Sequence, residues 1–166
     1  MLKLQVIYRT PITQQGKLAL TEKLAKLRDE LSEVIIAIAE AKKQGDLSEN
    51  FEYHAAKRRR GEVESLINEL DNYLKACMVS KLPTDPKSVC FGSKVILYCS
   101  EARMEYVILG EREADVDKGS ISINSPLCRA MLGQKVNFSF DLNGKTYEVL
   151  RIEPVSDQEL EQVIAS

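Results

Sequence analysis

The sequence has almost no histidine, the side chain that serves most often as a catalytic acid or base. Histidine occurs once among the 166 residues, at His54, and the chain has no Ser/His/Asp arrangement, Gly-rich phosphate loop or zinc-ligand spacing. His54 is a conceivable catalytic base, but a single histidine on a helix is more typical of a surface or packing residue. These absences indicate a protein that does not carry a complete catalytic pocket of its own.

Excess charge and long apolar runs are also lacking. The formal net charge is -2, which argues against strong overall attraction to nucleic acid, so any basic surface must be local. The longest apolar run, residues 34–39, is too short to span a bilayer. Because the N-terminus lacks the apolar segment and cleavage site of a signal peptide, we expect a cytoplasmic protein without membrane contact.

Cysteine is infrequent, and no two cysteines form a C-x-x-C pair. All four stand in apolar surroundings, so we interpret them as reduced core thiols rather than as metal ligands or disulfide partners. They are Cys77, Cys90, Cys99 and Cys128.

Proline is absent from residues 13–78, and this long stretch has the apolar periodicity of helices. Thr13, which follows Pro11, is a plausible N-cap. In the first half of the stretch the apolar spacing alternates between four and three residues, as in a coiled-coil seam over three heptads. The seam residues are Leu20, Leu24, Leu27, Leu31, Val34, Ile38 and Ala41.

A second seam follows and mirrors the first. When the two are paired in opposite directions, from Ala41 with Tyr53 to Leu20 with Leu74, the residue numbers of every pair add up to 94. Antiparallel arms that fold about position 47 have this property. The second seam consists of Tyr53, Ala56, Arg60, Val63, Ile67, Leu70 and Leu74.

The sequence therefore predicts a helical hairpin whose arms have about 30 residues, each on the order of 45 Å long. Arg60 is a charged residue at a seam position, where its stem can pack while its head reaches solvent. Two helices of a bundle are the alternative, but no third long helical pattern exists to complete one.

The second half of the chain has a different character. Residues 80–88 hold two prolines and are predicted to form a linker. A short helix is predicted at residues 126–133, and the tail from Ser156 has a weak helical pattern. Asn143 and Gly144 form a hairpin-turn signal between the last two of several predicted strands. The predicted strands are residues 93–98, 105–109, 120–123, 135–140 and 145–152.

These patterns predict an α+β fold with two domains. A long antiparallel coiled-coil hairpin occupies residues 1–79, with its tip near residues 45–50. After the linker, residues 89–166 form a small domain with a mostly antiparallel sheet.

The predicted tip, GDLSEN, carries two acids, Asp46 and Glu49. Asp46 as N-cap with Glu49 at the third helical position would complete a capping box, which is a purely structural role. At the end of a projecting hairpin the two carboxylates could instead share a magnesium ion that is held mainly by another protein. Two carboxylates are too few for a magnesium site of the protein's own.

A basic run follows the tip on the second arm, and two lysines lie opposite it on the first. Such a run is often a solvated helix face. Four consecutive cations, however, cover every face of a helical turn and would suit a nucleic-acid strand, with phosphate contacts that do not depend on its sequence. The residues are Lys42, Lys43, Lys57, Arg58, Arg59 and Arg60.

The stretch AIAEAKKQGDLSENFEYHAAK, residues 37–57, resembles the tip region of bacterial Gre (GreA/GreB) transcript-cleavage factors. ISINSPLCRAMLG, residues 121–133, is similar to a segment of their C-terminal domain, and Thr13, Gly16 and Leu20 fit an early family pattern. The tip motif is GreA-like, whereas the basic run is GreB-like. The resemblance covers nearly the whole chain.

The resemblance implies an FKBP-like C-terminal domain that docks at the rim of the secondary channel of RNA polymerase. It implies that the coiled coil enters this channel and that Asp46 and Glu49 help to hold a Mg²⁺ ion jointly with the polymerase. The polymerase, and not the factor, then hydrolyses the nascent RNA 3′ segment of a backtracked, arrested complex. The basic residues would guide that segment. We expect a monomer that binds no metal stably by itself.

Two departures from the family pattern keep other functions open. Phe51 stands where the family usually has a small residue, which suits a non-catalytic regulator or inhibitor that only occupies the channel. Cys128 replaces a common alanine. A simple coiled-coil interaction module, with the tip acids as caps, is a third interpretation.

Overall fold

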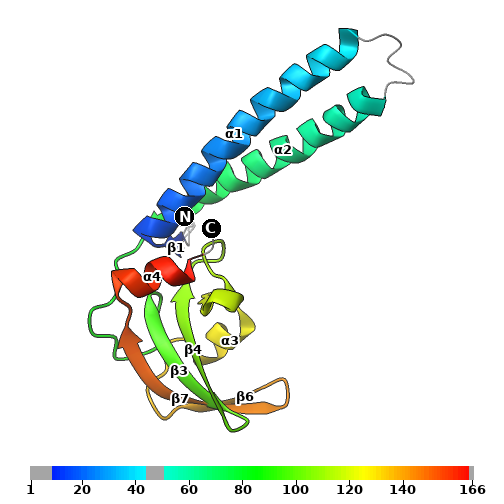
Figure 1. Ribbon diagram of the computed structural model, residues 1–166. Coiled ribbons are helices and arrows are strands. Elements are labelled where there is room, and N and C mark those ends of the chain that lie inside the picture. The colour runs from blue at the N-terminus through cyan, green and yellow to red at the C-terminus, as the bar shows by residue number, and fades with distance from the viewer. Residues whose placement is uncertain (1–8, 44–50, 165–166) are drawn as a thin grey trace, which may run out of the picture. The chain divides into compact units, whose positions relative to one another are not determined.

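The computed structural model describes residues 9–43 and 51–164 (Figure 1). The chain divides into two compact units. The helical unit is Leu18–Ala76, and the globular unit combines Met1–Lys17 with Cys77–Ser166. Within the described ranges, no helix is long and apolar enough to cross a membrane.

The helical unit consists of two long helices, α1 (Gln14–Lys43) and α2 (Phe51–Ala76), which lie side by side in Figure 1. Every predicted seam residue of α1 is buried or half-buried, and Leu24 and Ala41 are nearly inaccessible. On α2 the same holds for all seam residues except Arg60, whose side chain is exposed. The predicted seams are therefore confirmed as the contact between the arms.

Two ion pairs between the helices establish their antiparallel register. Arg59 on α2 pairs with Glu30 on α1, and their residue numbers add up to 89. Arg28 on α1 lies 3.6 Å from Asp71 on α2, and their numbers add up to 99. The two sums stand equally far on either side of 94. The pairs thus flank the seam on opposite sides, as the predicted fold-back requires.

The residues just before α1 and just after α2 form a small parallel sheet, which the sequence analysis did not predict. It joins β1 (Thr10–Ile12), before α1, to β2 (Cys77–Val79), after α2. Three-residue strands leave almost no periodicity in the sequence, and their pairing depends on residues more than sixty positions apart. Thr13 caps α1 as predicted, because its Oγ1 accepts a hydrogen bond of 2.8 Å from the Gly16 amide.

The main sheet of the globular unit curls around one side of its core (Figure 1). Among the described residues its strand order is β5-β4-β3-β7-β6. Neighbouring strands are antiparallel except β4 and β5, which are parallel, so the predicted mostly antiparallel sheet and the α+β class are confirmed. The strands are β3 (Ser93–Cys99), β4 (Ala102–Leu109), β5 (Ser120–Ser122), β6 (Ser139–Leu142) and β7 (Lys145–Pro154).

The strand predicted at residues 135–140 begins later, at Ser139. Asn137 has a φ of 68°, in the left-handed region, which interrupts the extended backbone before this strand. The turn between β6 and β7 is as predicted. Asn143 and Gly144 both have positive φ, 52° and 74°, between the paired residues Leu142 and Lys145.

One face of the sheet packs against α3 (Pro126–Met131), the predicted short helix. Alternate residues of β3 point to this core, and Cys128 and Met131 of α3 are fully buried in it. Cys99 and Cys128 are buried, and Cys77 and Cys90 are half-buried. None of these four cysteines takes part in a disulfide, as predicted. A 3₁₀ turn, η1 (Val116–Lys118), precedes β5.

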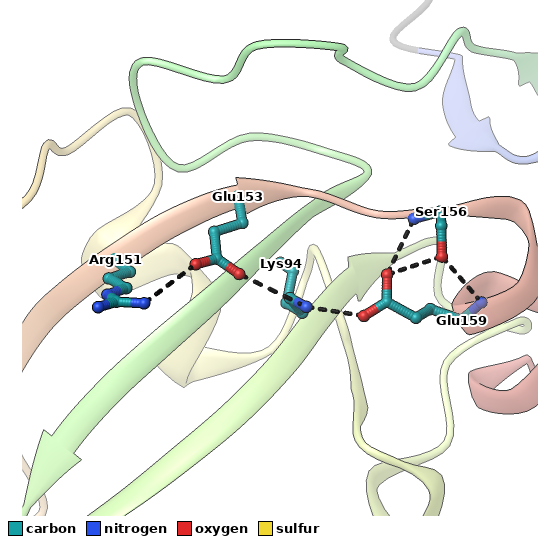
Figure 2. Close-up of polar contacts among 5 residues, drawn as sticks. All are labelled: Lys94, Arg151, Glu153, Ser156 and Glu159. Carbon is teal, nitrogen blue, oxygen red and sulfur yellow. Dashed lines mark hydrogen bonds and ion pairs between the residues drawn. The ribbon is translucent and has the colours of Figure 1, made fainter.

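A second apolar cluster lies under the C-terminal helix α4 (Asp157–Val163), where Leu160 packs with Val107 and Leu109 of β4. Figure 2 shows the polar contacts that hold the start of α4. Ser156 and Glu159 form a capping box, and Nζ of Lys94 on β3 lies 2.7 Å from Glu159 Oε1. Lys94 and this cap lower the pKa of Glu159 to about 2. The tail from Ser156, which has only a weak helical pattern in the sequence, therefore forms a capped helix.

Candidate functional site

The candidate site lies where α1 ends and α2 begins. Lys42 and Lys43 occupy the last turn of α1, and both side chains are exposed. The basic run on α2 starts at Lys57, somewhat less than two helical turns after the first residue of the helix. Asp46 and Glu49, the predicted metal ligands, lie outside the described residues, so their role stays a prediction.

Two of the four cations in the run are paired with carboxylates. Arg59 donates from Nε to Glu30 Oε1 at 2.8 Å and from Nη1 to Glu62 at 3.2 Å. These carboxylates raise the pKa of the Arg59 guanidinium, with the Glu30 hydrogen bond as the largest cause. Arg60 donates from Nε to Glu64 at 2.8 Å, one helical turn away. Glu62 and Glu64 follow Arg59 and Arg60 at helical spacings of three and four residues in the sequence.

Glu30 was not recognised from the sequence as part of this surface. It belongs to α1 and meets Arg59 only because the arms are antiparallel, at positions that flank the seam on one side. The heptad pattern could have predicted this contact. In an antiparallel pair, a residue that flanks the seam on one arm faces the residue at the same heptad position on the other arm.

The remaining cations point to solvent. Arg58 is exposed and makes no ion pair with any residue that the structure describes. Nζ of Lys57 lies 6.0 Å from the ring centroid of Tyr53, at the outer limit of a cation–π contact. With Lys42 and Lys43 they form the exposed basic surface, a name used below for Lys42, Lys43, Lys57 and Arg58.

His54 is exposed and stands edge-on to Tyr53, with ring centroids 5.5 Å apart and an interplanar angle of 66°. This contact fits a surface and packing role better than that of a catalytic base. Over residues 9–43 and 51–164, no group of three or more His, Cys, Asp or Glu side chains could hold a metal ion.

Comparison with known proteins identifies the family. The N-terminal domain model of the GreA/GreB transcription elongation factors matches residues 10–79, and their C-terminal domain model matches residues 83–154. The chain belongs to the GreA/GreB family. Its helical and globular units thus fall largely within the two domains by which this family is defined.

The sequence relatives agree with this assignment. The chain is 42% identical to a transcription elongation factor GreA from Caulobacter vibrioides, over 87% of this chain and 98% of that protein. It is 43% identical to the GreA of Trichlorobacter lovleyi, over 86% and 95%. A crystal structure of the GreA factor homolog Gfh1 of Thermus thermophilus covers 87% of this chain and 99% of that chain, at 24% identity. Its TM-score of 0.44 is too low to add to the assignment.

Membership makes this protein a transcription elongation factor by family. The exposed basic surface and the paired cations Arg59 and Arg60 flank the acidic segment GDLSEN in the sequence. This part of the hairpin is therefore the candidate functional site.

Proposed function

We propose that this protein rescues arrested transcription by stimulating RNA cleavage within RNA polymerase. The end of the hairpin that carries residues 44–50 enters the secondary channel of the polymerase, while the globular unit docks at the channel rim. The polymerase hydrolyses the RNA of the backtracked complex. The factor contributes side chains to that reaction and is not an enzyme by itself.

The observation that carries this proposal is the order of charges along the hairpin. α1 ends at Lys43 and α2 begins at Phe51, so Asp46 and Glu49 belong to the segment that joins the two helices. Exposed cations precede and follow that segment. A phosphate backbone at the acids would therefore have positive charge close by as well, which offsets the repulsion between carboxylate and phosphate.

The donor chemistry of the two acids suits magnesium. Mg²⁺ prefers carboxylate oxygens and usually takes one or two of them, with water and phosphate oxygens as its other ligands. When bound between both proteins, the ion would lower the pKa of a water and stabilise charge on the phosphate that is attacked. Asp46 and Glu49 would supply two of its oxygens and orient that water. The exposed basic surface would hold the RNA 3′ segment in line.

Amide variants test the role of the acids without removing their capping ability. Asn caps a helix about as well as Asp, and Gln can replace Glu in a capping box, but neither amide is a hard anionic ligand. We expect Asp46→Asn and Glu49→Gln to leave helicity unchanged and to abolish factor-dependent RNA cleavage in a stalled, backtracked complex. Glu52→Gln removes the same charge from the first turn of α2, outside the pair, and is the control.

The same cleavage assay can also contradict the proposed role of Asp46 and Glu49. If Asp46→Asn cleaves as fast as the parent, the two acids do not act as metal ligands. If the amide variants and the Glu52→Gln control lose activity to the same extent, the acids act through net charge alone.

A specific observation supports a second candidate, a non-catalytic regulator that occupies the channel. Phe51, the first residue of α2, is a large apolar side chain that is 79% exposed, and it stands two residues after Glu49 in the chain. In this case the parent would not stimulate cleavage but would still compete with another cleavage factor for the polymerase. A Phe51→Ala variant that gains cleavage would identify Phe51 as the blocking side chain.

A further inference from the structure

A carboxylate outside the proposed site is fully buried at the start of α1. Glu113 follows β4 in the loop that begins at Gly110, and its side chain has no exposed surface. Its Oε1 accepts hydrogen bonds from the amides of Gly110, at 2.8 Å, and Thr13, at 3.1 Å. Its Oε2 accepts from the Thr13 hydroxyl at 2.6 Å. Burial of a carboxylate is costly, so a set of donors this complete indicates a specific role.

The contacts continue into the first turn of the helix. While it donates to Glu113, Thr13 Oγ1 also accepts from the amide of Gly16. Glu113, Thr13 and Gly16 thus form a chain of hydrogen bonds from the loop after β4 to the first turn of α1, here called the root anchor. All three residues belong to the globular unit. α1 itself continues beyond Lys17 into the helical unit.

Gly16 is explained by the same contact. A Cβ at position 16 would overlap Oε2 of Glu113, so any other residue would displace the carboxylate. Glycine is a poor helix former and costs roughly 0.5–1 kcal/mol relative to alanine. The close approach of Glu113 therefore explains why a glycine stands in the first turn of this long helix.

The caps of α3 and α4 show that an ordinary helix cap needs no buried carboxylate. Ser125 caps α3 and Ser156 caps α4 with side chains close to the surface, and neither cap uses a buried acid from elsewhere in the chain. A threonine cap alone would satisfy the first turn of α1 in the same way. Glu113 therefore adds a contact between the loop after β4 and the start of α1 that capping alone does not require.

We propose that Glu113 is a positioning residue for the proposed cleavage function. Through Thr13 and Gly16 it holds the first turn of α1, the helix that carries Lys42 and Lys43 in its last turn. Stimulation of cleavage requires reacting groups to be placed to within about 1 Å, so a frayed root weakens the effect of residues far along the hairpin. This inference rests on the proposed function.

Two pairs of variants isolate the anchor. Gly16→Ala forces Glu113 out of place, whereas Gly61→Ala adds the same methyl group to an exposed site of α2 where nothing lies within 4 Å. Thr13→Val keeps the shape of the side chain but removes the hydroxyl, whereas Thr13→Ser keeps the hydroxyl. Two further variants complete the set: Glu113→Ala alone, and Glu113→Ala combined with Gly16→Ala. In the double variant the added methyl group at position 16 meets no carboxylate.

Two measurements on the full-length variants follow. Hydrogen exchange of the Gly16 and Lys17 amides reports the root itself, and we expect about tenfold or faster exchange in Gly16→Ala and Thr13→Val than in their controls. With backtracked polymerase we expect the maximal cleavage rate to fall about tenfold, because misplacement by about 1 Å is enough for such losses. The half-saturating factor concentration should change little, since Thr13, Gly16 and Glu113 are buried and the exposed surface of the globular unit is not substituted. Thr13→Ser should behave as the parent.

The outcomes separate the inference from the proposed function. Unchanged exchange in Gly16→Ala and Thr13→Val overturns the anchor. Faster exchange with full cleavage shows that the anchor does not position anything. A general loss of thermal stability and polymerase binding, in place of a selective loss of cleavage rate, would show a merely structural role. If the parent itself does not cleave, the proposed function fails, and the exchange data alone decide whether the anchor exists.

Discussion

The carboxylate of Glu30 on α1 accepts a hydrogen bond of 2.8 Å from Nε of Arg59 on α2. This contact joins the two arms of the hairpin and at the same time neutralises one cation of a run that sequence analysis assigned to RNA. About half of the Arg59 side chain remains exposed, so the pair contributes little to stability. Its larger effect is on which cations remain available to a phosphate backbone.

Release of Arg59 should strengthen binding of single-stranded RNA. Glu30→Gln removes the main carboxylate partner of Arg59, and one further phosphate contact steepens the salt dependence of log K by about 0.7. The measurement is a titration of short RNA at several salt concentrations. Glu33→Gln, an exposed acid on the same helix, is the control for net charge. Equal slopes for the two variants would show that Glu30 does not restrain Arg59.

Arg58 and Arg60 should differ although they are close in the chain. Arg58 is exposed and unpaired within the described ranges, whereas Arg60 is paired with Glu64. Arg58→Ala should therefore raise the factor concentration needed for half-maximal cleavage by roughly threefold or more. Arg60→Ala should act mainly on the helix, at a cost of about 0.2–0.5 kcal/mol of its stability. Equal effects on cleavage would mean that the ion pair with Glu64 opens when RNA binds.

Acid should release the C-terminal helix through Glu159. Because Lys94 and the Ser156 cap lower the pKa of Glu159 from 4.5 to about 2, its contribution to stability is present above pH 4.5. The contribution is lost as the pH falls from about 4.5 to about 2. Glu159→Gln should therefore lower the melting temperature at pH 7, by an amount that corresponds to about 1 kcal/mol or less for this partly exposed pair.

The difference between parent and Glu159→Gln should shrink through that pH range and vanish near pH 2. Glu161→Gln, on the exposed side of the same helix, should show no such dependence. A difference that stays constant from pH 7 to pH 2 would exclude the Lys94 pair as its source.

Cys128 should resist alkylation in the folded protein. Its burial in the core raises the pKa of the thiol to about 12, and the thiolate is the reactive form. With iodoacetamide at pH 8, we expect Cys77 and Cys90, which are half-buried, to be labelled first. Mass spectrometry of peptides from native and unfolded samples measures the order. Labelling of Cys128 at the rate of Cys90 would show that the core around α3 opens readily.

The hairpin is the part of the structure that sequence analysis described best. A seam that repeats at four and three residues determines which face of each helix is buried, because helix geometry is local and regular. The constant sum of 94 then determined the antiparallel pairing, and the ion pairs Glu30–Arg59 and Arg28–Asp71 stand on either side of it. The turn at Asn143 and Gly144 was equally readable, since its positive φ values restrict the residue types.

Other features depend on contacts between distant parts of the chain. The three-residue strands β1 and β2 carry no periodic pattern and exist only because Thr10 and Cys77 meet. Nothing local in the sequence distinguishes Glu113 from the charged residues around it. Its burial follows from a partner, Thr13, that lies a hundred residues earlier in the chain.

The sequence by itself determined the helical hairpin, the mostly antiparallel sheet and the family, because each is encoded in short-range spacing or in a contiguous motif. Only the tertiary structure decided that Arg59 is neutralised across the hairpin and why the first turn of α1 has a glycine at position 16. Both depend on a carboxylate brought from another element, Glu30 from the opposite arm and Glu113 from the loop after β4. Local periodicity carries no information about such long-range partners.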